Sequence, residues 1–181
     1  MRALLPAALL LLAAPAGLTA PVPGFYPLIP GTTWTYTSGE TQVVGTPTTV
    51  RGIRVTPVSH QYGGKTYTQD LLEARADGSI WLRGVNAGGR LTWYATPLNV
   101  YPPGPLHPGQ HWQSGSGALK SSGSVTGTAP LRVPAGTFNA LVIRTDLSVG
   151  GQQSTQITYF VPGLGVVRYQ TADGSQIDLL K

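Results

Sequence analysis

A short motif occurs twice in this chain, and it constrains the fold more than any other feature of the sequence. The copies at residues 27–34 and 105–112 both read P-L-x-P-G-x-x-W. Proline fixes φ, the glycine that follows permits a positive φ, and the tryptophan then falls in a β-rich run. Each copy therefore predicts a turn that leads into a strand, with Trp34 and Trp112 as structural plugs buried at the start of that strand.

The turn signals that follow each copy come in the same order. They are Gly63-Gly64 and Asp77-Gly78 after the first copy, and Gly150-Gly151 and Pro162-Gly163 after the second. Strand-like runs lie between these turns, so we predict an internal repeat of one meander over residues 27–100 and 105–181. The alternative is that any glycine-rich all-β protein has turn signals at similar spacing, in which case their shared order does not indicate a repeat.

The composition also favours β structure. The 181 residues include 24 Gly and 16 Pro, with a single Met. Residues 141–149 alternate apolar and polar side chains, which is typical of a half-buried strand. We predict an all-β fold: a single curved antiparallel sheet, as a half-barrel or open barrel, built from the repeated meander.

The first residues are typical of a secretory signal peptide. A basic start precedes the apolar run 3–14 and a small-residue site, so we predict a signal peptide over 1–16, with cleavage after residue 20 as the alternative. The apolar run is too short to span a bilayer. Residues 17–181 are then a single β domain that is periplasmic or extracellular. The sequence has no cysteine, so we expect the protein to have neither a disulfide scaffold nor a lipid anchor.

The sequence offers few groups for catalysis or metal binding. Pro108 and Gly109 separate His107 from His111, so the helix that would bring these two imidazoles together is not expected. His60 is expected to be a hairpin residue, and Asp70 can be judged only in three dimensions. No G-x-S-x-G motif occurs. We predict no catalytic residue, no metal and no cofactor.

Aromatic and basic residues suggest a ligand face on the concave side of the sheet. The candidates are Trp81, Trp93, Tyr94, Arg51, Arg54, Arg83 and Arg90. Arginines at the rim would favour an anionic head group. The alternative is that most of the aromatics pack in the core and the arginines are solvated. The net charge of +5 comes without any lysine-rich run, so no nucleic acid partner is expected.

Three further motifs resemble those of a broad group of secreted bacterial β-rich proteins. They are the Y-P-L-x-x-G-x-x-W-x-Y opening at 26–36, the V-P-A-G-T-F turn at 133–138 and the Y-x-x-P-G-x-G-x-V end at 159–167. The resemblance implies an extended antiparallel sheet and supplies no catalytic residues. More distantly, the chain is similar to the curved half-barrel of periplasmic lipoprotein carriers, which hold acyl chains in their concavity.

Together these observations predict a noncatalytic exported protein of the cell envelope with a binding or scaffolding role. One alternative is a carrier of a hydrophobic or lipid-like ligand in the concave face, and another is an enzyme. The partner would be an envelope glycan, a lipid or another protein. A polar cluster in a pocket would favour the enzyme, an apolar groove the carrier, and a filled interior the scaffold.

Overall fold

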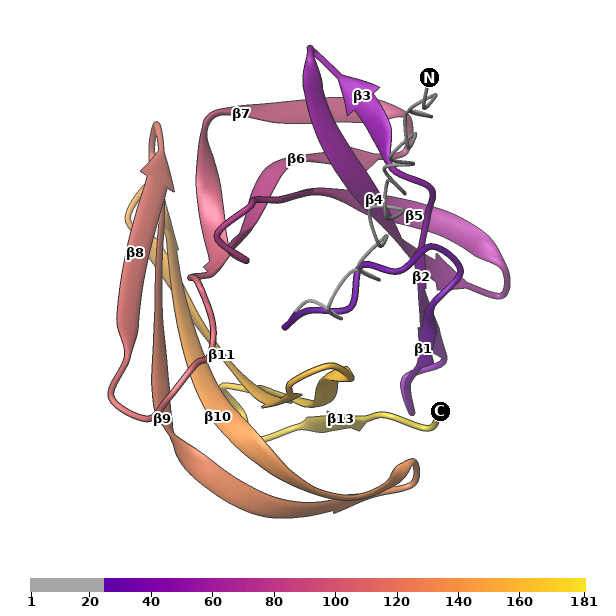
Figure 1. The fold of residues 1–181 in the computed structure, drawn as a ribbon, viewed down its shortest axis with the longest axis vertical. Helices are drawn as coiled ribbons and strands as arrows, with labels where there is room; N and C mark the ends of the chain where they lie inside the picture. Colours follow the sequence, from indigo (N-terminus) through magenta and orange to yellow (C-terminus); the bar gives the residue numbers. More distant parts are fainter. Residues whose placement is uncertain (1–24) are drawn as a thin grey trace, which may run out of the picture.

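The structure is a computed structural model that describes residues 25–181, and its regular structure there is antiparallel β (Figure 1). The predicted signal peptide and its cleavage site lie outside the described residues. Within residues 25–181, no helix is long and apolar enough to cross a membrane.

The first sheet contains the strands of the N-terminal half. Its members are β1 (Thr33–Thr35), β2 (Glu40–Val44), β3 (Thr48–Val50), β4 (Ile53–Tyr62), β5 (Lys65–Ala74), β6 (Ile80–Ala87) and β7 (Arg90–Tyr101). They pair in the order β1-β2-β4-β5-β6-β7, and β3 adds to β4. Apart from β3, each strand pairs with the next along the chain, which makes the sheet a meander.

The second sheet contains the strands of the C-terminal half. They are β8 (His111–Ser116), β9 (Leu119–Val133), β10 (Gly136–Val149), β11 (Gln152–Val161), β12 (Gly165–Thr171) and β13 (Gln176–Asp178). They pair strictly in chain order. The predicted all-β antiparallel class is thus confirmed, but the strands form two sheets instead of one, and neither sheet closes on itself.

Each copy of the repeated motif leads into the first strand of its sheet, through the same backbone hydrogen bonds. The amide of Gly31 donates to the Val44 carbonyl at 2.8 Å, and the amide of Gly109 donates to the Val125 carbonyl at 2.8 Å. Each valine amide donates back to the residue after the glycine, at 2.9 Å in both copies. Both glycines have φ of 87°, which explains why glycine is needed there.

The two tryptophans differ in burial. Trp34 is 3% exposed, and its indole nitrogen Nε1 donates to the Leu164 carbonyl at 2.7 Å, as expected of a buried plug. Trp112 is only half-buried, so the prediction of a second buried plug is wrong. Its ring covers Gly123 and leaves no room for a Cβ atom there. The repeat over 27–100 and 105–181 stays a prediction.

The two sheets are joined along β1 by the last residues of the chain. The Thr35 amide donates to the Lys181 carbonyl at 2.9 Å, and the Leu180 amide donates to the Thr35 carbonyl at 2.7 Å. Where β7 meets β8, the Asn99 amide donates to the Ser114 hydroxyl at 2.9 Å. Both sheets therefore border one interior, and the core cluster contains side chains from each of them.

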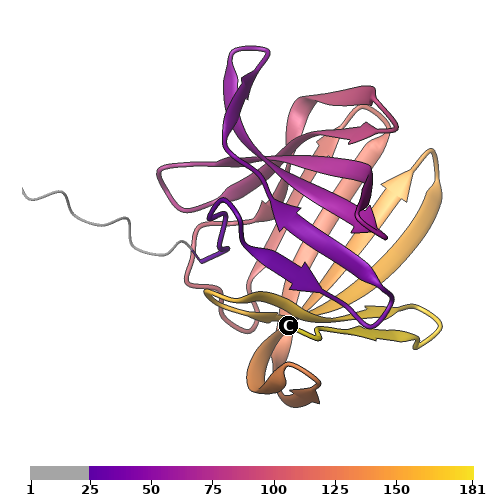
Figure 2. The same ribbon diagram turned by 90° about the vertical axis from the view of Figure 1, so that its right-hand side faces the viewer.

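The segment before β1 enters this interior (Figure 1). The Phe25 ring stacks on Phe160 with the centroids 4.6 Å apart, and the Tyr26 centroid lies 5.3 Å from that of Tyr101. The turns of the hairpins β1–β2, β10–β11 and β12–β13 lie on the opposite side of the molecule, at the right of Figure 2. The N-terminal aromatic residues thus fill one end of the space between the sheets.

Candidate ligand-binding cavity

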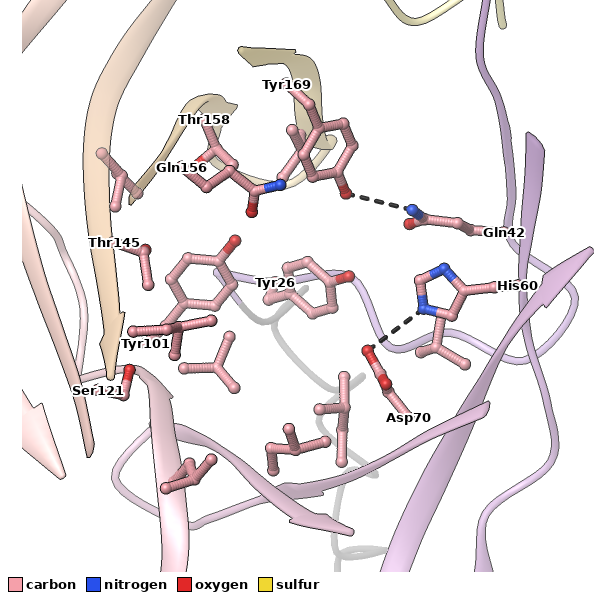
Figure 3. A pocket seen from close by; sticks show the side chains of 18 of the residues that line it. Tyr26, Gln42, His60, Asp70, Tyr101, Ser121, Thr145, Gln156, Thr158 and Tyr169 are labelled. Atoms are coloured by element: carbon pink, nitrogen blue, oxygen red, sulfur yellow. Dashed lines mark hydrogen bonds and ion pairs between the residues drawn. The ribbon is translucent and has the colours of Figure 1, made fainter. Parts of the chain in front are cut away.

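The part of the interior beyond these aromatic residues is hollow. The cavity has a volume of about 460 Å³ (Figure 3), which lies within the range of about 300–1,000 Å³ that is common for small-molecule sites. Its apolar wall comes from both sheets and includes Val58, Leu72, Leu82, Leu98, Val100, Ile143, Val166 and Ile177.

Alternation along the strands places polar side chains beside this wall. In a strand, residues i and i+2 share a face, so Val58 and His60 of β4 point the same way, as do Asp70 and Leu72 of β5. All four line the cavity. In each of these two strands, an apolar side chain and an ionisable side chain two residues away therefore line the same cavity.

His60 lies between two carboxylates, each from a strand adjacent to its own. Its Nδ1 is 2.8 Å from Glu40 Oε1, and its Nε2 is 3.2 Å from Asp70 Oδ2. Glu40 also accepts hydrogen bonds from Gln42 Nε2 and the Tyr67 hydroxyl, both at 2.9 Å. His60 lies in the β4–β5 hairpin opposite Thr68, as the sequence suggested, but its side chain also lines the cavity, which the sequence did not indicate.

The carboxylates control the protonation of His60. Burial by itself disfavours the imidazolium, but the hydrogen bonds to Asp70 and Glu40 and the charges of both outweigh it and raise the pKa of His60 to about 9. The hydrogen bond from His60 is the largest cause that lowers the pKa of Glu40 to about 2. At neutral pH, two carboxylates and one imidazolium leave a single net negative charge.

Tyrosine hydroxyls add neutral polar groups. Tyr26 and Tyr101 line the cavity, and neither hydroxyl bonds to another residue within the described part of the chain. Burial raises the pKa of both, so they remain neutral hydrogen-bond donors. The Tyr169 hydroxyl is already engaged, accepting from Gln42 Nε2 at 3.2 Å. Figure 3 shows the Tyr26 ring between Tyr101 and the pair His60–Asp70.

None of the residues predicted as a ligand face lines this cavity. Trp81 and Arg83 alternate with Leu82 in β6 and therefore point away from it. The Arg83 Nε is 2.7 Å from Glu73 Oε2, and the Arg75 guanidinium lies 4.1 Å from the centroid of the Trp81 ring. The expectation that these residues lie on the concave side was wrong.

The remaining predicted face residues lie elsewhere on the first sheet. The Arg51 guanidinium lies 5.8 Å from the centroid of the Trp93 ring, at the turn between β3 and β4. Tyr94 is half-buried in β7, and Arg54 and Arg90 are exposed. Of the predicted face residues, Arg51 lies near Trp93. Arg83 is linked to Trp81 only indirectly, because Glu73 pairs with both Arg83 and Arg75 and Arg75 lies over the Trp81 ring. Ligand binding by this outer group stays a prediction.

A second hollow, of about 640 Å³, lies beside β8 to β11. It is lined mainly by serine and glutamine side chains, and its charged pair is already formed, with Arg144 Nε 2.9 Å from Asp146 Oδ2. It lacks an apolar wall, which makes it a weaker candidate than the cavity between the sheets.

Comparisons with known proteins add little. Neither a protein-family model nor a curated protein matches the chain. Among solved structures, the chain is similar to a protein from Bacteroides fragilis with a YmcC-like fold, at 15% sequence identity and a TM-score of 0.48. The alignment covers 88% of this chain and 99% of the other chain. A likeness at this level supports no argument about the fold, a ligand or the function of this protein.

Proposed function

We propose that this protein is a noncatalytic, exported binding protein of the cell envelope that holds one small amphiphilic molecule between its two sheets. The observation that carries the proposal is the cavity of about 460 Å³, with an apolar wall and a polar cluster beside it. Sites of this kind usually combine a largely apolar lining with a few polar groups that orient the ligand.

The geometry of His60 supports binding over catalysis. Both ring nitrogens are engaged by carboxylates, and a pKa of about 9 keeps the ring protonated at neutral pH. A general base needs an unprotonated nitrogen within reach of its substrate. His60 therefore serves better as a fixed part of the cavity wall than as a proton acceptor.

The space between the sheets supports a carrier over a scaffold. A scaffold needs no interior space, and the other end of the interior is in fact filled, by Phe25, Tyr26 and the core around Phe160. The export expected from residues 1–16 supports a role at the envelope. An immunoblot of the periplasm, the membranes and the medium would test this location.

The ligand itself is tested by filling the cavity. Thr145, in β10, lines it, whereas Thr137 lies on the same strand and is exposed. We expect native mass spectrometry of protein from its own envelope to show a bound small molecule in the wild type and in Thr137→Trp, and its loss in Thr145→Trp. If wild-type protein carries no small molecule and takes up none from an envelope extract, the proposal fails.

A further inference from the structure

We infer that the cavity selects a ligand whose head group is a protonated amine. This inference rests on the proposed binding function and names the class of ligand. It is carried by the charges of the lining, by the carboxylate oxygen that remains free, and by the position of the Tyr26 hydroxyl.

The charges of the lining favour a cation. Glu40 and Asp70 outnumber His60, and neither lysine nor arginine lines the cavity. The side chains of His60 and Glu40 are only 18% and 17% exposed, so their charges are weakly screened by water. An anionic head group would meet one uncompensated negative charge in a partly desolvated space, whereas an ammonium group would neutralise it.

Asp70 is the carboxylate with capacity for a ligand. Both oxygens of Glu40 are occupied, Oε1 by His60 and Gln42 and Oε2 by Tyr67. Asp70 accepts only through Oδ2, from His60, and its other oxygen has no partner among residues 25–181. Its side chain is 35% exposed and points into the cavity (Figure 3). A carboxylate oxygen accepts and never donates, so the group that pairs with it must donate a hydrogen bond.

A tyrosine hydroxyl and the apolar wall complete the site. In Figure 3 the Tyr26 hydroxyl points toward the pair His60–Asp70, and its oxygen can accept a hydrogen bond from an ammonium group held there. The wall formed by Leu72, Leu82 and Leu98 extends from the Asp70 side of the cavity. A single alkyl or aryl chain along this wall would leave its amine at Asp70.

The test compares three probes with the same chain. Octylamine, octyl glucoside and octanoate are titrated calorimetrically into the full mature protein at neutral pH, below their aggregation limits. We expect octylamine, which is protonated at this pH, to bind at least about tenfold more tightly than octanoate, with the neutral glucoside between them.

Two variants locate the preference. Asp70→Asn should abolish the difference between octylamine and octanoate while the glucoside still binds, and Asp146→Asn, which removes a carboxylate beside the second hollow, should leave all three affinities unchanged. Equal affinities in the wild type, or tighter octanoate binding, would overturn this inference and leave the proposed function standing. Failure of all three probes, together with a wild type free of bound small molecule, would count against the proposed function itself.

Discussion

His60 links three strands of the first sheet through its two ring nitrogens. Glu40 belongs to β2 and Asp70 to β5, on either side of β4 in the sheet. Because the imidazolium is hydrogen-bonded on both sides, its charge is favoured in the folded protein and not in the unfolded chain. Folding stability should therefore depend on the protonation of this residue.

Raising the pH should therefore weaken the folded protein. The pKa of His60 rises from 6.5 to about 9 on folding, so its contribution is complete below pH 6.5 and is lost as the pH rises through 9. We expect urea unfolding of the wild type to show a loss of roughly 1–3 kcal/mol between about pH 6 and about pH 9.5. His60→Gln should show little change over the same range, and parallel pH curves for the two proteins would refute the assignment.

Glu40 should make folding stability depend on pH in the acidic range. Its pKa falls from 4.5 to about 2 on folding, so the stability that it contributes is present above pH 4.5 and is lost as the pH falls through 2. Glu40→Gln should be less stable than the wild type at pH 5 and should lose less stability between pH 5 and pH 2, as measured by urea unfolding followed by circular dichroism. Asp146→Asn, whose carboxylate pairs with Arg144 at the surface, is the matched control.

Sequence spacing does not reveal such a cluster. Glu40, His60 and Asp70 lie on three different strands and are brought together by register alone, with Gln42 opposite His60 in one ladder and Thr68 opposite it in the next. Each residue by itself looks like an ordinary polar position near a turn. A usable signal was the alternation Val58-x-His60 and Asp70-x-Leu72, which places an ionisable group on the face of a core residue.

At the scale of single elements, the first strands of the two sheets share a way of packing. Trp34 covers Gly165, where an added Cβ atom would lie 3.3 Å from the indole nitrogen. Trp112 covers Gly123, where an added Cβ atom would lie 2.2 Å from the ring. The second contact is far tighter than any real Cβ contact, so β8 and β9 can pair as they do only with glycine at that position.

Gly123→Ala tests this contact. The new methyl group must displace the Trp112 ring, and we expect a loss of roughly 1–3 kcal/mol in the free energy of unfolding. Gly127→Ala, on the same strand with no atom within 4 Å of the added Cβ, should change it little. In a Trp112→Ala background the penalty of Gly123→Ala should nearly vanish. Additive effects in this double-mutant cycle would show that the two residues do not interact.

Truncating the tryptophans should show their different burial. Trp34→Ala removes a 3% exposed side chain together with its hydrogen bond to Leu164, so we expect a loss of roughly 3–5 kcal/mol. Trp112 is half-buried and borders the cavity, and its truncation should cost clearly less. Chemical denaturation of both variants provides the comparison, and equal losses would contradict the difference in burial.

Elements were easier to predict than their assembly. Glycine pairs such as Gly63-Gly64 and Gly150-Gly151 have positive φ and form the hairpin turns β4–β5 and β10–β11, as their local chemistry requires. The division into two sheets depends on how residues 102–110 redirect the chain and on contacts between distant segments. Neither has a signature in strand periodicity, which is the same for one sheet and for two.

At the scale of the whole molecule, the last residues of the chain connect the sheets. Leu179 bridges Tyr36 of the first half, and its amide donates to the Val167 carbonyl of β12 at 2.9 Å. Its carbonyl accepts from the Ala135 amide, in the turn between β9 and β10, at 3.1 Å. The side chain is 1% exposed and belongs to the core shared by both sheets. Neither sheet is therefore expected to be stable without the other.

Leu179→Ala tests this coupling, with Leu180→Ala as the neighbouring control. Leu179 is 1% exposed and Leu180 is 40% exposed, so the same truncation should cost about 2–4 kcal/mol at the first position and less than about 1 kcal/mol at the second. Because both sheets share one core, the weakened variant should still unfold in one step, with tryptophan fluorescence and far-UV circular dichroism giving the same midpoint. Two separate midpoints would mean that the sheets unfold independently and that the interior between them is not a single cooperative unit.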